Sequence, residues 1–167
     1  TPDKCSDIFL SPGKLRTGKA FVAAFNAQGE LRYRLTTAEE YHGVALSPQR
    51  QEALVVPTQD ALPALLLEVS SGALKHALMP PADCHFTGHA CVSKNGERLF
   101  TAENAFHQGV GQIGVWQAQS GKRLGAWSSG GVGPHELGLL SDNRTLVVAN
   151  GGIKTHPDSG KQELNVA

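Results

Sequence analysis

The chain has 167 residues, enough for one domain of ordinary size, and its 15 basic and 15 acidic residues leave no formal net charge. The absence of a basic cluster disfavours nucleic-acid binding, and no apolar run reaches the roughly 18–20 residues that span a bilayer. Charged residues make up only 18% and glycines number 19, a composition typical of short strands joined by tight turns.

The first recurring feature along the chain is a hairpin whose turn contains glycine. After a short strand expected near 7–10, residues 20–26 and 30–35 form two strands around Gly29. The pattern returns in ALLLEVSSGALKHAL, which turns at Gly72, and in IGVWQAQSGKRLGAW, which turns at Gly121. These three glycines are 43 and 49 residues apart.

A second hairpin, opened by a histidine, alternates with the first. His42 opens HGVALSPQRQEALVVPT, His89 opens HACVSKNGERLFTAEN and His135 opens HELGLLSDNRTLVVAN. The histidines are 47 and 46 residues apart. Self-similarity at a period of about 40–50 residues, with strands inside each unit, is typical of propeller blades.

The predicted fold is therefore all-β, a β-propeller with four-stranded blades in which the histidine hairpin is the inner pair. We expect a single partial domain over 1–167, with blade repeats at roughly 20–60, 61–106 and 107–153. A propeller usually needs four to eight blades, so these three predict part of a larger ring. Open blade edges would favour self-association.

The histidine series is the strongest candidate site, because the innermost strand of every blade lines the central channel. Imidazole nitrogens on one ring can hold a transition metal such as iron or copper. The competing interpretation is that each histidine braces the neighbouring blade through hydrogen bonds. The primary candidates are His42, His89 and His135, and the secondary ones are His85 and His156.

Three further polar residues fall near the histidines, at or close to predicted strand ends: Glu103, Glu136 and Asn150. A carboxylate or amide beside a histidine can orient it as an outer partner, or can serve only in ordinary hydrogen bonding. The cluster from Cys84 to Cys91 has no established zinc spacing, and buried thiols are the better interpretation.

Three runs carry a family resemblance: GHACVSKNGERLFTAENAF, GVGQIGVWQAQSGKRLGAW and GGVGPHELGLLSDNRTLVVANGGIKTHPDSGK. They resemble the bacterial domain-of-unknown-function 1513 family, whose members are longer than this chain. The resemblance implies a seven-bladed, WD40-like propeller in the periplasm. The chain itself begins TPDKCSD, without a signal peptide.

The resemblance also bears on the site. Family members are often encoded near imelysin-type, iron-regulated proteins, which implies a link to metal uptake. The family's histidines match His42, His85, His89, His135 and His156, whereas Cys84 and Cys91 depart from its pattern.

We expect a non-enzymatic binding or scaffold protein that handles iron or another transition metal at the channel mouth. Two alternatives stay open. One is a propeller enzyme of the quinoprotein dehydrogenase or lactonase type, which rests on fold analogy and is disfavoured by the few acidic residues on the inner strands. The other is a platform for a protein partner, with no small ligand.

Overall fold

The structure, a computed structural model, describes residues 8–49, 51–58, 62–156 and 160–162. Within these ranges the chain forms antiparallel strands joined by turns, and no helix is long and apolar enough to cross a membrane. The predicted all-β class is confirmed.

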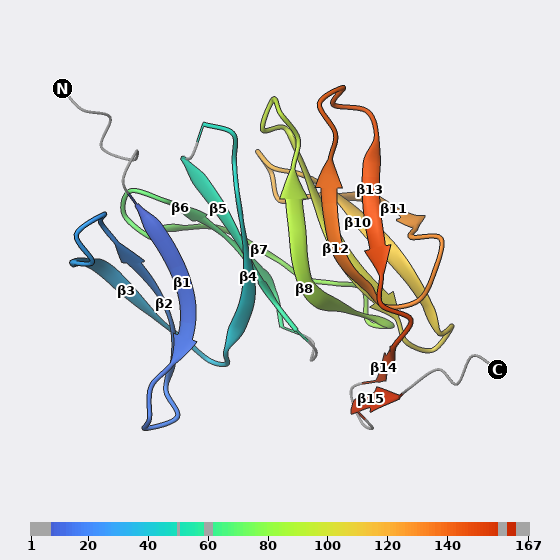
Figure 1. Cartoon of the computed structure of the whole chain (residues 1–167), viewed down its shortest axis with the longest axis horizontal. Helices are drawn as coiled ribbons and strands as arrows, with labels where there is room; N and C mark the ends of the chain where they lie inside the picture. The colour runs from blue at the N-terminus through green and yellow to red at the C-terminus, as the bar shows by residue number, and fades with distance from the viewer. Residues whose placement is uncertain (1–7, 50, 59–61, 157–159, 163–167) are drawn as a thin grey trace.

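The strands group into successive sheets, each built in chain order (Figure 1). The first sheet contains β1 (Phe9–Lys14), β2 (Ala20–Phe25) and β3 (Leu31–Thr37). The second contains β4 (Tyr41–Leu46), β5 (Glu52–Pro57), β6 (Ala64–Glu68) and β7 (Leu74–Leu78). The third contains β8 (Cys84–Val92), β9 (Arg98–Ala105), β10 (Val110–Gln117) and β11 (Arg123–Ser128). Two hairpins follow: β12 (Pro134–Leu139) with β13 (Leu146–Asn150), and β14 (Lys154–His156) with β15 (Gly160–Gln162).

The sheets lie side by side in chain order, and the first strands of neighbouring sheets contact one another. β1 lies against β4, β4 against β8, and β8 against β12 (Figure 1). This arrangement is that of propeller blades whose innermost strands line a common axis. The predicted propeller architecture is confirmed.

The repeat boundaries predicted from the sequence are shifted relative to these sheets. The predicted unit 61–106, for example, takes β6 and β7 from the second sheet and β8 and β9 from the third. The two four-stranded sheets instead begin with a histidine hairpin and end with a glycine-turn hairpin, because β5 pairs with β6 and β9 pairs with β10. The sequence predicts both hairpin types, but its periodicity does not indicate which of the two begins a blade.

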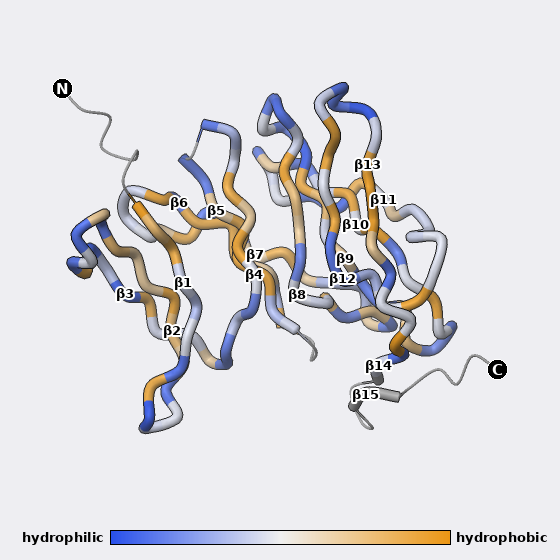
Figure 2. Tube along the Cα trace, viewed as in Figure 1, coloured by the Kyte–Doolittle hydropathy of each residue, from blue (hydrophilic) through white to orange (hydrophobic). Residues whose placement is uncertain are grey.

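Buried apolar side chains of neighbouring sheets pack together in three clusters. Hydrophilic residues gather at many of the turns (Figure 2). Leu54 and Leu66 of the second sheet pack against Phe86 and Trp116 of the third. Smaller clusters join the first sheet to the second, and the third sheet to β12. Burying one such side chain contributes about 1.5–3 kcal/mol, so blade-to-blade packing is the main support for the position of the first strands.

A buried ion pair lies inside the third sheet. The Glu103 side chain is fully buried, and Arg123 donates to both of its carboxylate oxygens at 2.8 Å. Thr101 and Gln112 donate to the same carboxylate at 2.8 and 2.9 Å. The Trp116 indole N–H donates to Thr101 Oγ1, and its ring lies 4.8 Å below the Arg123 guanidinium carbon. This network links β9, β10 and β11.

Candidate functional site

Two glycines allow β4 and β8 to come into backbone contact. A Cβ on Gly43 would overlap the carbonyl oxygen of Gly88. Gly88 has φ +97°, and a Cβ there would lie 2.6 Å from Thr58 Cγ2 and 2.7 Å from His42 Cδ2. Only glycine combines that backbone conformation with so close a contact. The close contact brings His42 against the residues that follow Gly88.

A bulge in β8 sets the direction of His89. The register between β8 and β9 shifts between Phe86 and Ala90, so that three residues of β8 stand opposite a single residue of β9. His89 is the last of the three. It therefore lies within β8 rather than at the start of an inner strand, where the sequence repeat had placed it.

The structure brings the three primary histidines into one row. The His89 ring lies between the other two, with its centroid 5.1 Å from that of His42 and 4.6 Å from that of His135. They come from β4, β8 and β12, the first strands of successive blades. His42 and His135 are exposed, whereas the His89 side chain retains 16% of its accessible surface. We call these three residues the histidine row.

Glu136 holds the central histidine of the row. Its Oε2 atom lies 3.1 Å from Nδ1 of His89, which places the Nδ1–H tautomer of the neutral ring with its N–H toward the carboxylate. Nε2 of His89 is buried and has no hydrogen-bond partner among the described residues. Burial lowers the pKa of His89 below 6.5, and His135 and His42 lower it further, while Glu136 opposes the shift. At neutral pH the Nε2 lone pair is consequently available.

The lowered pKa makes stability depend on pH. The unfolded chain takes up a proton at His89 near pH 6.5, before the folded chain does, so the free energy of unfolding falls as pH drops below that value. We expect H89Q to flatten this part of the profile, because glutamine does not titrate. Urea unfolding between pH 5 and 8 measures both curves, and identical slopes would contradict the expectation.

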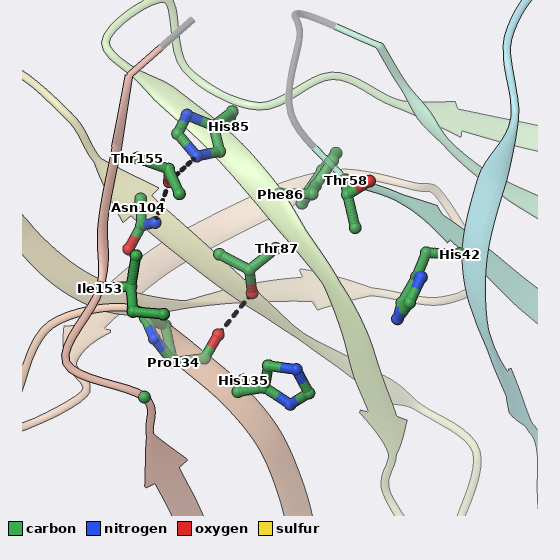
Figure 3. A pocket seen from close by; sticks show the side chains of 12 residues that line it. His42, Thr58, His85, Phe86, Thr87, Asn104, Pro134, His135, Ile153 and Thr155 are labelled. Carbon is green, nitrogen blue, oxygen red and sulfur yellow. Dashed lines mark hydrogen bonds between the residues drawn. The ribbon is translucent and has the colours of Figure 1, made fainter. Parts of the chain in front are cut away.

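A cavity of about 270 Å³ adjoins the row. His42 from β4, His85 from β8 and His135 from β12 all contribute to its wall (Figure 3). His85 is 2% exposed, and its Nε2 atom lies 2.6 Å from Thr155 Oγ1. The secondary candidate His85 therefore shares a cavity with two members of the row. β14 includes His156, whose side-chain placement lies outside what the structure describes.

Two of the polar candidates, Glu103 and Asn150, make their hydrogen bonds to residues outside the histidine row. Both oxygens of Glu103 accept hydrogen bonds from Arg123 within the third sheet. The amide of Asn150 exchanges hydrogen bonds with Ser129, donating to its carbonyl oxygen at 2.9 Å and accepting from its hydroxyl at 2.8 Å. The hydrogen bonds of both side chains are thus made to partners outside the row, Arg123 for Glu103 and Ser129 for Asn150.

The cysteines contribute little as ligands. Burial raises the pKa of both Cys84 and Cys91 to about 12, with nearby carboxylates adding to the shift. Both thiols are thus protonated at neutral pH, and the thiolate is the form that binds metal. Both are free thiols, and Cys5 lies outside the described residues.

Asn104 and Thr155 belong to the cavity wall but had no signal in the sequence. Asn104 is 4% exposed and donates to Thr155 Oγ1 at 2.5 Å. They are 51 residues apart; Asn104 ends the second histidine hairpin and Thr155 lies in the last of the three family-like runs, but neither was a candidate site residue. Only the pairing of β8 with β9 and the return of the chain after β13 bring them together.

The sequence profile described as "Protein of unknown function (DUF1513)" matches residues 35–167, which is most of the chain. The chain belongs to the DUF1513 family. No curated protein matches it.

Solved structures agree with the DUF1513 chain in fold. Kuenenia stuttgartiensis hydrazine synthase matches with a TM-score of 0.65 and 13% identity, covering 86% of this chain and 41% of that one. The structure of the Dos1 propeller matches with a TM-score of 0.61 and 16% identity, covering 81% of this chain and 35% of that one. The chain thus spans less than half the length of these two proteins, and at such identities the likeness shows a shared fold alone.

Proposed function

We propose that this DUF1513 protein is a non-enzymatic binding protein that holds a transition-metal ion at the histidine row, with iron or copper as the natural cargo. The observation that carries the proposal is the state of His89. Its Nδ1 atom is bound to Glu136, and its buried Nε2 atom has no partner among the described residues. A carboxylate that fixes the far nitrogen of a histidine is the usual outer partner of a metal-bound imidazole.

The chemistry of the row fits such an ion. Neutral imidazole suits iron, copper, zinc and nickel. As the side chains lie, the described residues include no group of three or more His, Cys, Asp or Glu placed to hold a metal. Metal binding therefore requires the rings of His42 and His135 to turn toward Nε2 of His89. Both side chains are exposed, and neither ring forms a hydrogen bond with another described residue.

The family resemblance supports this proposal through its link to iron-regulated neighbours, and it also motivates a periplasmic location, which we include in the proposal. A channel mouth formed by the first strands of several blades would present the ion to a partner protein or release it to solvent. Further blades of a larger propeller would add walls to the same channel.

Titration with Zn²⁺, a redox-inert ion that also prefers imidazole, tests the proposal by calorimetry. We expect one ion per chain. H89A should weaken binding at least about 100-fold, and E136Q about 10–100-fold, the usual cost of losing an outer partner. H76A is the matched control, because His76 lies on β7, where its Nε2 atom contacts the backbone oxygen of Gln119 at 2.9 Å. It should bind as the parent does. Absence of stoichiometric binding, or equal loss in H76A and H89A, would refute the metal site.

A further inference from the structure

We infer that two copies of this chain close one propeller ring, in which the open face of the first sheet of each copy packs on the open face of the β12–β13 hairpin of the other. The first sheet and this hairpin lie at opposite ends of the series of sheets (Figure 1). The contact between copies would thus be a blade-to-blade interface like those within the chain. The inference concerns a protein interface and does not depend on the metal site.

The first sheet has one packed face and one open, aromatic face. Leu10 and Val22 belong to the cluster that joins this sheet to the second one. Because side chains alternate along a strand, their neighbours Phe9 and Phe21 point the other way. Phe9 is opposite Phe25 in β2, and Phe25 is opposite Leu31 in β3, so these residues share the open face. Phe9 and Leu31 each retain more than half of their accessible surface.

The β12–β13 hairpin also has an open face, and its apolar side chains are smaller. Leu137 and Val148 pack toward the third sheet. Val147 and Ala149 flank Val148 along β13 and therefore point away from the third sheet, and both are exposed. Leu140, at the turn after β12, is exposed as well and extends this aliphatic strip.

The interface between the second and third sheets shows how two such faces fit. There Leu54 and Leu66 of the second sheet pack against Phe86 and Trp116 of the third. An aliphatic face thus meets the aromatic face of the next sheet in chain order. The open faces repeat this order, because the last hairpin presents aliphatic side chains and the first sheet presents three phenylalanines. Joining them continues the interface that already exists between the sheets, and it removes two exposed apolar surfaces from water.

The number of sheets is consistent with a closed pair. Strands β1 to β13 form four sheets, so two copies would place eight around the common axis, within the usual range of four to eight blades. One copy covers only 35% of the Dos1 propeller chain, so a ring like that one needs more blades than one copy provides. In the closed pair both head-to-tail contacts form together, and both histidine rows line one channel.

Sedimentation velocity of the full chain tests the inference, with EDTA present so that no metal joins the copies. We expect a dimer of twice the 17.7 kDa chain mass. F9E/L31E on one face, or V147E on the other, should each weaken dimerisation at least about 100-fold, because a carboxylate would be buried without a partner. L74E is the matched control, since Leu74 on β7 is equally exposed but lies on neither face. It should dimerise as the parent does.

A mixture of the two face variants shows which faces meet. A pair made of one F9E/L31E chain and one V147E chain keeps one unaltered contact, so the mixture should dimerise at concentrations where each variant alone is monomeric. Circular dichroism checks that each variant is folded. A parent chain that stays monomeric at about 0.1 mM would overturn the inference and assign the faces to another polypeptide. So would a mixture that stays monomeric, or growth into long oligomers, which a head-to-tail contact gives when the ring does not close.

Discussion

Replacing Arg123 by alanine should lower the free energy of unfolding by roughly 3–5 kcal/mol, the range measured when one partner of a buried ion pair is removed. The Glu103 carboxylate has no exposed surface and would lose two of its four hydrogen bonds. The same change also removes the cation above the Trp116 ring.

Urea unfolding followed by tryptophan fluorescence measures this loss. The matched control is the double variant E103M/R123M, in which neither charge is left alone. It should recover most of the stability, because uncharged side chains of similar size often replace a buried pair with little loss. If R123A costs less than about 1 kcal/mol, the pair behaves like an exposed one and the brace that we assign to β9, β10 and β11 does not exist.

Replacing Gly43 by alanine should separate β4 from β8 and cost up to about 3 kcal/mol, the upper range for overpacking a tight contact. The new methyl group would occupy the position of the Gly88 carbonyl oxygen, which is backbone and cannot rotate away. The same movement would draw His42 away from His89. Zn²⁺ affinity should therefore fall together with stability.

G138A is the matched control for this change. Gly138 also lies on a first strand, β12, but a Cβ there would meet nothing within 4 Å. Its stability should match that of the parent or rise slightly, because alanine restricts the unfolded chain. Thermal unfolding of both variants, with Zn²⁺ titration of each, gives the comparison. Similar behaviour of the two would show that Gly43 has no special role in placing the row.

The sequence predicts that the three primary histidines lie close together, because the repeat alone places them at equivalent positions of successive blades. Residues at equivalent positions in stacked blades meet whenever the blades share an axis. The sequence does not predict which hairpin begins each blade, since the alternating hairpins can be grouped into four-stranded units in two ways. Only the pairing of β5 with β6 decides between them. Glu136 was predicted beside a histidine, and it is one residue away from His135 yet binds His89.

The polar interior was harder to anticipate. The Glu103 carboxylate could have accepted a hydrogen bond from a histidine, but its side chain lies on the face of β9 where Gln112 and Arg123 donate to it. Asn104, the next residue, points to the opposite face and reaches Thr155. Alternation along a strand separates two neighbours completely, and the sequence does not say which face meets the axis.

The most direct test of the histidine row is a crystal structure of the chain grown with Zn²⁺ and measured at the zinc absorption edge. We predict one strong anomalous peak at about 2.0–2.1 Å from Nε2 of His89, with the His42 and His135 rings turned toward it. Glu136 should still accept a hydrogen bond from Nδ1. A zinc ion bound elsewhere, or an Nε2 atom that donates to a protein or water oxygen in the presence of zinc, would contradict the account.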